Sequence, residues 1–111
     1  MCIVPSEIKM GGTSVPGATV ETILEVIEAF GDAAKRAVET GVDCVEFHVA
    51  HGYSLRSFLS AGINKRTDEY GRSLENRARY SLEFIDAIRR NIPDHMPILM
   101  RTVAKVERQK L

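Results

Sequence analysis

Segments with the periodicity of helices and segments with the composition of strands alternate twice along this chain. Residues 20–40 and 74–91 carry apolar side chains at helical spacing. Each of these segments is followed by a short, β-prone run, at residues 42–48 and 98–101. Where helices and strands alternate in this way, consecutive strands pair in parallel and each helix forms a right-handed crossover. The sequence therefore predicts an α/β fold with an α-β-α-β unit and parallel strands.

Both predicted helices carry capping signals. Thr19 and Ser73 suit N-cap positions, because a hydroxyl oxygen there can accept from a backbone N–H of the first turn. Glu21 and Glu75 follow in the first turns, where the helix dipole favours negative charge, and Gly41 suits the position after the first helix. The stripes expected to be buried are Val20, Ile23, Leu24, Ile27, Phe30, Ala34, Ala37 and Val38 in the first helix, and Leu74, Ala78, Leu82, Ile85 and Ile88 in the second.

The rest of the chain divides around this unit. Residues 1–18 are rich in Gly and Pro and are expected to be a loop, residues 19–101 form the core, and residues 102–111 are a basic tail. Residues 49–72 form a long polar loop of the kind that is usually functional or mobile. Two strands leave sheet edges open on both sides. We therefore expect the chain to self-associate or to be part of a larger barrel.

Two histidines and a tyrosine follow the first predicted strand. His48 ends the strand, and His51 and Tyr53 come directly after it. Side chains alternate along a strand, so Cys44, Glu46 and His48 share one face while Val45 and Phe47 share the other. In α/β folds, ligands bind at the carboxyl ends of parallel strands. The residues suit a site in which two imidazoles hold a ligand oxygen and a phenol donates a proton.

Composition excludes several classes of partner. The 111 residues include 15 Lys and Arg and 15 Asp and Glu, so a formal net charge of zero gives no reason to expect nucleic acid or a membrane surface. No apolar run reaches the roughly 20 residues of a membrane span, and no secretory signal is readable. Cys2 and Cys44 are too few for a disulfide scaffold, so both are expected to be reduced thiols of a cytoplasmic protein.

The ordered motifs resemble one family closely. Residues 5–101 resemble the middle of the Old Yellow Enzyme family, the FMN-dependent NAD(P)H:flavin oxidoreductases with a (β/α)8 barrel. The motifs that carry the resemblance are residues 41–53 (GVDCVEFHVAHGY), 58–60 (FLS), 64–71 (NKRTDEYG) and 73–77 (SLENR), with Pro5-Ser6 before them. Ala61 and Arg72 depart from the family, which usually has Pro and Gly there, and the tail after Arg101 departs as well. A barrel needs about 250 residues, so the resemblance implies a partial TIM barrel.

The resemblance also implies roles for four residues. His48 and His51 would donate hydrogen bonds to the oxygen of an α,β-unsaturated carbonyl substrate, and Tyr53 would be the general acid. Arg101 would contact FMN, at the same sheet edge as His48, and NAD(P)H would be the reductant. The implied activity is reduction of an activated C=C bond in a small enone-type substrate.

Plainer interpretations remain open for the same residues. His48 and His51 could be a structural pair, or could bind zinc with Cys44, although a His-x-x-His pair alone is weak evidence for a metal and we expect none. Tyr53 could pack on the next helix, and Arg101 could pair with Glu46. Arg66 and Asp68 are expected to pair locally. For the whole chain, the alternative to an enzyme is a non-catalytic fragment or interaction module that does not bind flavin alone.

Overall fold

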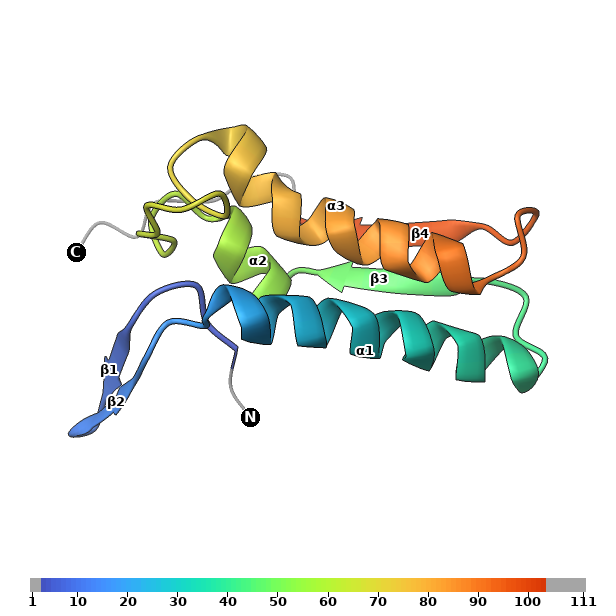
Figure 1. Ribbon diagram of the computed structural model, residues 1–111, viewed down its shortest axis with the longest axis horizontal. Helices are drawn as coiled ribbons and strands as arrows, with labels where there is room; N and C mark the ends of the chain where they lie inside the picture. Colours follow the sequence, from blue (N-terminus) through green and yellow to red (C-terminus); the bar gives the residue numbers. More distant parts are fainter. Residues whose placement is uncertain (1–2, 104–111) are drawn as a thin grey trace.

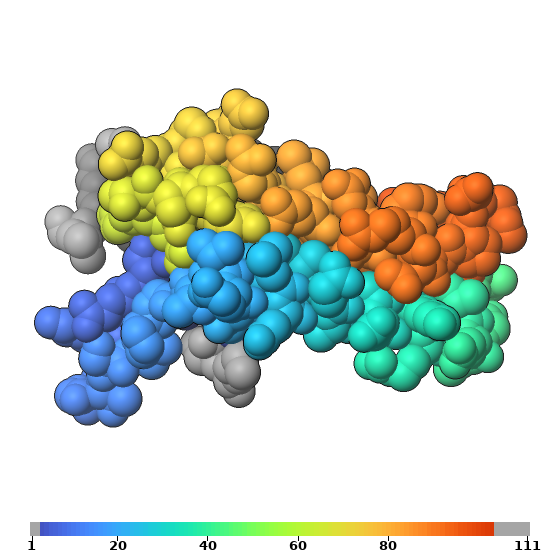
Figure 2. Space-filling model, viewed as in Figure 1, coloured from blue at the N-terminus to red at the C-terminus, as the bar shows by residue number. Residues whose placement is uncertain are grey.

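A computed structural model describes residues 3–103 of the chain (Figure 1). The molecule measures 45 × 29 × 27 Å. Its elements in chain order are β1 (Ile8–Met10), β2 (Thr13–Val15), α1 (Val20–Glu39), β3 (Val45–Val49), α2 (Ser54–Leu59), α3 (Leu74–Asn91) and β4 (Ile98–Thr102). Helices α1 and α3 lie side by side over one face of the β3–β4 pair, and Figure 2 shows them in contact along much of their length.

Strands β3 and β4 pair in parallel, as the sequence predicts. Val45 lies opposite Ile98, and the register continues to Val49 opposite Thr102. His48 is therefore directly opposite Arg101 at the carboxyl end of the pair. Among the described residues, these two strands form a sheet of their own, separate from the β1–β2 hairpin.

Helix α1 confirms its predicted bounds and N-cap. The Thr19 hydroxyl oxygen accepts from the backbone N–H of Thr22 at 3.1 Å. The predicted buried stripe is only partly right, because Leu24 and Phe30 keep about half of their surface exposed. The buried positions are Ile23, Ile27, Gly31 and Ala34. The buried face is narrower than the sequence suggests, because α3 covers only one side of α1.

Helix α3 also has its predicted bounds, with Ser73 as N-cap. Its predicted buried stripe is wrong in part, because Leu74 and Leu82 are exposed at 68% and 56%. Ile88 is buried as predicted, and the other buried positions are Tyr80, Ser81, Phe84 and Ala87. Aromatic packing explains this rotation: Tyr80 stacks on Phe58 of α2 at a centroid distance of 4.0 Å, and Phe84 packs on Phe47 of β3 at 5.8 Å.

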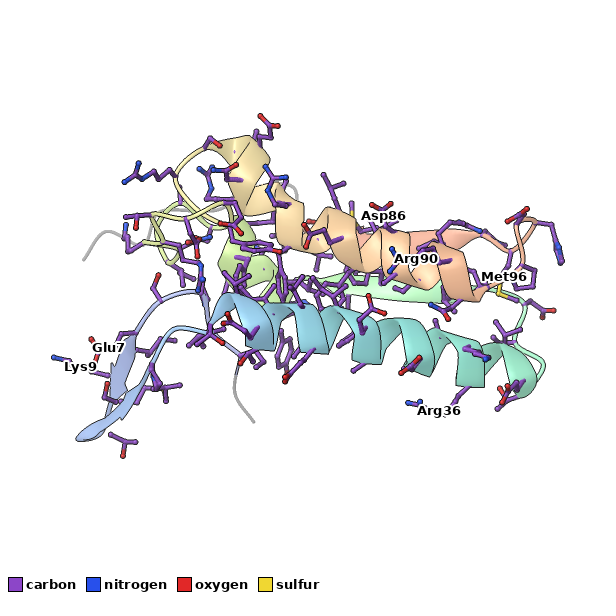
Figure 3. The ribbon with its side chains drawn as sticks, in the orientation of Figure 1. Glu7, Lys9, Arg36, Asp86, Arg90 and Met96 are labelled. Carbon is purple, nitrogen blue, oxygen red and sulfur yellow. The ribbon has the colours of Figure 1, made fainter. Side chains whose placement is uncertain are left out.

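The prediction that residues 1–18 lack regular structure is wrong for residues 8–15. Strands β1 and β2 form an antiparallel hairpin with Met10 opposite Thr13. The two turn residues between them, Gly11 and Gly12, have φ of 53° and 83°, which glycine adopts without steric cost. The hairpin projects from the helices, and Figure 3 shows Glu7 and Lys9 there, at the opposite end of the molecule from Met96.

The predicted loop at residues 49–72 is also interrupted. Helix α2 occupies Ser54–Leu59 and buries Leu55 and Phe58 against α3. The helix is short, and its N-cap residue, Tyr53, makes no side-chain capping bond. The remainder, residues 60–72, has no helix or strand.

The two faces of the sheet differ in burial. Phe47 and Val49 of β3 point into the core, as predicted for that face. Strand β4 is largely exposed, with Leu99 and Met100 at 50% and 54%. Leu99 lies on the face of Glu46 and Arg101, and Met100 lies on the face of Phe47, so the apolar side chains of β4 are open to solvent on both faces.

Some sequence predictions concern residues outside the described range. Cys2 and residues 104–111 of the predicted tail are among them. Thr102, which we assigned to the tail, is the last residue of β4. Within residues 3–103, neither long helix has a stretch apolar enough to cross a bilayer.

Candidate active site

The carboxyl end of β3 brings the predicted histidines and tyrosine together. The ring centroids of His48 and His51 are 5.1 Å apart, and those of His48 and Tyr53 are 5.8 Å apart. His48 is the next-to-last residue of the strand and is half-buried, whereas His51 and Tyr53 are exposed. The buried residues Val49 and Ala50 lie between His48 and the pair His51 and Tyr53, and they fix the backbone that carries all three to the core.

The backbone between these residues makes a sharp turn. His51 has φ of 57° and Gly52 has φ of 74°, both in the left-handed region. Tyr53 follows as the N-cap residue of α2, and its backbone N–H donates to the Ala50 carbonyl at 3.4 Å. The chain reverses at this turn, so the side chains of His51 and Tyr53 both lie near that of His48.

Two hydroxyl contacts at this turn were not predicted from the sequence. Ser57 of α2 donates from Oγ to the Gly52 carbonyl oxygen at 3.0 Å. The Ser54 and Tyr80 hydroxyls lie 3.2 Å apart and join α2 to α3. Burial raises the pKa of Tyr80, so this phenol stays protonated. The sequence signal for the Ser57 contact was a serine between the apolar residues Leu55 and Phe58, because the helix that buries those two residues buries Ser57 as well.

Arg101 lies at the same edge but is held by Glu46. Its Nε donates to Glu46 Oε1 at 2.7 Å, which is the plainer interpretation of these two residues. This hydrogen bond lowers the pKa of Glu46 and raises that of Arg101. Glu46, His48 and Arg101 therefore share one face of the sheet, opposite the core.

An apolar groove of about 750 Å³ leads away from this cluster. It runs between the inner face of α1 and the free edge of β3, and His48 and Tyr53 line one end. Apolar side chains such as Val26, Phe30 and Val45 line the rest, with Ile3 and Val4 of the N-terminal segment.

The loop after α2 is braced by Asn64 and Arg66. The buried Asn64 donates from Nδ2 to the carbonyls of Phe58 and Tyr70 at 2.8 and 2.7 Å. Arg66 makes the predicted ion pair with Asp68, with Nη2–Oδ2 at 2.6 Å, and its Nη1 also donates to the carbonyls of Pro5 and Ala18. These residues hold the loop against the base of α2, away from the cluster itself.

A metal centre gains no support from the geometry. Within residues 3–103, no three His, Cys, Asp or Glu side chains converge as a metal site would require. Cys44 is an exposed free thiol at the opposite end of β3 from the turn that carries His51. The zinc interpretation that combined Cys44 with the two histidines is therefore not adopted.

Comparisons with known proteins identify relatives of the chain. Residues 4–110 match the NADH:flavin oxidoreductase / NADH oxidase family. An NADH:flavin oxidoreductase from Gibberella zeae is 51% identical over 105 residues, which are 92% of this chain and 25% of the relative. The chain thus spans about a quarter of the length of this curated relative.

Solved structures agree with the sequence match. Morphinone reductase in complex with tetrahydroNAD superposes with a TM-score of 0.79 at 32% identity, over 90% of this chain and 32% of that one. Old Yellow Enzyme from Pichia sp. AKU4542 superposes with a TM-score of 0.78 at 37% identity, over 88% and 28%. The sequence match and the similarity of fold together show that this chain belongs to the NADH:flavin oxidoreductase / NADH oxidase family of FMN-dependent, Old Yellow Enzyme-like oxidoreductases.

Proposed function

We propose that this chain supplies the substrate-binding edge of an FMN-dependent barrel that reduces α,β-unsaturated carbonyl compounds with NAD(P)H. The observation that carries the proposal is the convergence of His48, His51 and Tyr53 on the edge where Arg101 lies in the neighbouring strand. Family membership supplies the cofactor class. The closed (β/α)8 barrel is part of the proposal, because the described residues form one α/β portion with a single parallel strand pair.

His48 and His51 hold the carbonyl oxygen of the substrate. Two imidazole N–H donors on one oxygen stabilise the negative charge that develops there as the double bond is reduced. The ring centroids are 5.1 Å apart, which is close enough for one N–H group from each ring to reach the same oxygen atom. The two histidines therefore orient the substrate as well as activate it.

Tyr53 donates the proton that completes the reduction. Its ring lies beside His48, and its side chain is 67% exposed, so it can reach a substrate held by the histidines. A phenol is a suitable general acid for a developing carbanion, because the proton transfer becomes favourable only as charge builds on carbon. Tyr53 would protonate the α-carbon while the oxygen stays on the histidines.

Arg101 is the residue of this chain best suited to contact FMN. FMN, when bound and reduced by NAD(P)H, would supply the hydride for the β-carbon. Glu46 engages Nε of Arg101, and neither Nη atom makes a hydrogen bond to residues 3–103, so both are available to a ligand with adjacent acceptor atoms. The guanidinium is permanently charged and planar, which fits the acceptor edge of a flavin ring.

Tyr53→Phe tests the assigned proton donor in a complete barrel. A chimera of Pichia Old Yellow Enzyme carrying residues 4–103 of this chain in place of the matching segment provides that context. Stopped-flow absorbance would follow flavin reduction by NAD(P)H and flavin reoxidation by an enone separately. We expect the variant to slow reoxidation by about 10²–10⁴-fold and to leave reduction unchanged. Equal losses in both half-reactions would contradict the role of Tyr53.

A second function is favoured by the open groove beside α1 and the exposed face of β4. The chain alone would then be a non-catalytic fragment that docks with other protein surfaces and does not bind flavin. A cytoplasmic location, with Cys44 as a free thiol, is part of either proposal. Flavin content and solution mass of the purified chain distinguish the two functions, as set out for the whole molecule below.

A further inference from the structure

The turn that carries His51 and Tyr53 has a backbone that needs external support. His51 is a non-glycine residue at φ 57°, a conformation that costs about 1–2 kcal/mol. Gly52 at φ 74° is conformationally permissive, and a side chain there would meet no atom within 4 Å. Neither residue would keep the turn in place by itself. Such strained conformations persist only where the surroundings hold them.

Ser57 makes two hydrogen bonds to this turn. Its Oγ donates to the Gly52 carbonyl at 3.0 Å, and its backbone N–H donates to the Tyr53 carbonyl at 2.9 Å. The side chain is 6% exposed, so water does not readily replace the hydroxyl.

The support behind Ser57 is itself rigid. Its neighbour in α2, Phe58, is fully buried and stacks on Tyr80 of α3, which is also fully buried. The hydroxyls of Ser54 and Tyr80 join the first turn of α2 to the same helix. Ser57 therefore connects a packed aromatic cluster to a turn that has few contacts of its own.

We propose that Ser57 is a positioning residue that fixes His51 and Tyr53 relative to His48 by holding the Gly52 carbonyl. Without the hydroxyl, the peptide between Gly52 and Tyr53 can rotate, because glycine permits it. That rotation moves the two side chains on either side of Gly52 in different directions. The consequence for catalysis rests on the proposed function, whereas the consequence for the turn does not.

The first experiment measures the turn directly in the 111-residue chain. NMR coupling constants between the amide and α protons of His51, together with ¹⁵N relaxation at residues 51–53, report φ and local mobility. We compare the wild-type chain with Ser57→Ala and Ser57→Thr, of which the second retains the hydroxyl. The matched control is Ser81→Ala, since Ser81 is also buried but its Oγ has no partner among the described residues.

The positioning role predicts a specific pattern. Ser57→Ala averages the His51 coupling constant and raises mobility at residues 51–53, while Ser57→Thr and Ser81→Ala keep the wild-type values. An unchanged turn in Ser57→Ala, or the same change in Ser81→Ala, overturns the proposal. If Ser57→Ala leaves too little folded chain to measure, a crystal structure of the variant in the chimeric barrel gives the position of the Gly52 carbonyl instead, and an unmoved carbonyl overturns it.

The second experiment measures the consequence for chemistry in the chimeric barrel. We expect Ser57→Ala to slow flavin reoxidation by an enone about 10- to 100-fold, with flavin reduction by NAD(P)H unchanged and with activity restored in Ser57→Thr. A chimera that keeps Ser57 but reduces no enone contradicts the proposed function and leaves the NMR result to decide the role of Ser57. A loosened turn with unchanged reoxidation overturns the positioning role for an active enzyme.

Discussion

Arg66 contacts three parts of the chain that are distant from one another in sequence. Its guanidinium pairs with Asp68 through two hydrogen bonds and donates to the Pro5 and Ala18 carbonyls, on either side of the β1–β2 hairpin. Its side chain is only 10% exposed. The planar fork of arginine can satisfy these acceptors at once, which the point charge of lysine cannot. The sequence predicted the Asp68 pair but not the two carbonyls, because they depend on where the hairpin folds back.

Replacing Arg66 by Ala should destabilise the chain by about 2–3 kcal/mol, because two carbonyls and the Asp68 carboxylate lose their donors. Chemical denaturation followed by circular dichroism measures the change. Arg90→Ala is the matched control, since its ion pair with Glu28 is exposed at 62% and 69% and should be worth less than about 1 kcal/mol. Equal effects of the two substitutions would show that the Arg66 contacts add nothing beyond a surface pair.

The Asp68 carboxyl should make stability depend on acid. The hydrogen bond from Arg66 holds the pKa of Asp68 below its usual value. The unfolded chain therefore binds this proton more readily than the folded chain. The stabilisation is fully present above the unfolded pKa of about 3.9 and is lost as pH falls through the lower folded pKa. Asp68→Asn should remove this component, so its stability difference from wild type should shrink below about pH 4. A difference that stays constant from pH 6 to 3 would contradict the lowered pKa.

The common position of the four candidate site residues was predictable because they lie at or near strand ends, whereas the position of Ser57 was not. His48, His51, Tyr53 and Arg101 stand at or just after β-prone runs, and parallel pairing brings such ends to one edge. The role of Ser57 depends on the left-handed backbone at His51, which no residue type in the turn demands.

At the scale of elements, the two long helices were predictable in their bounds but less so in their buried faces. Thr19 and Ser73 are strong capping signals that act locally, so α1 and α3 begin where expected. Which side of α3 is buried depends on Phe47 and Phe58, which belong to other elements. Periodicity alone therefore favoured Leu74 and Leu82, although both are exposed.

The short elements were missed for two different reasons. The Gly11-Gly12 pair between two short runs is a recognised hairpin signal, so β1 and β2 could have been found. Helix α2 has six residues and no side-chain cap, and it forms because Leu55 and Phe58 are buried against α3. Tertiary packing of this kind leaves little trace in local sequence.

Gly31 lies where α1 and α3 pack closely, and its replacement by Ala tests that contact. An added Cβ would lie 2.8 Å from Asn91 Nδ2 and 3.2 Å from the Ala87 carbonyl oxygen. Alanine should gain about 1 kcal/mol of helix propensity, but we expect a net loss of about 1–2 kcal/mol because the helices must separate. Thermal unfolding measures the balance, with Asp32→Ala on the exposed side of α1 as control. A higher melting temperature for Gly31→Ala would mean that Asn91 moves aside freely.

At the scale of the whole molecule, apolar side chains are exposed on more than one surface. The groove lies between α1 and β3, whereas Leu99 and Met100 are exposed on the two faces of β4, the other strand of the pair. Neighbouring barrel strands would cover both. Exposed apolar patches of this kind drive association.

The isolated chain should therefore be colourless and self-associating. Tight flavin binding needs preorganised backbone N–H groups around the phosphate, whereas this chain offers Arg101 and the histidine cluster. The visible spectrum near about 450 nm, where bound flavin absorbs, and the solution mass by light scattering measure the two properties after incubation with FMN. The chimeric barrel with residues 4–103 is the control and should be yellow. A yellow monomeric 111-residue chain would overturn this prediction and make the chain an enzyme in its own right.

The parallel pairing of β3 with β4 also determines the order in which the chain can fold. Val45 meets Ile98, so α2, the braced loop and α3 all lie within the segment that must close before the first ladder bond forms. A parallel pair has no tight turn from which to nucleate, and closing a long segment costs entropy before any contact offsets it. We expect docking of Phe84 on Phe47 to shorten that search by bringing α3 onto β3 first. The edge that carries His48 and Arg101 is thus assembled late, after the helix that joins its two strands has been placed.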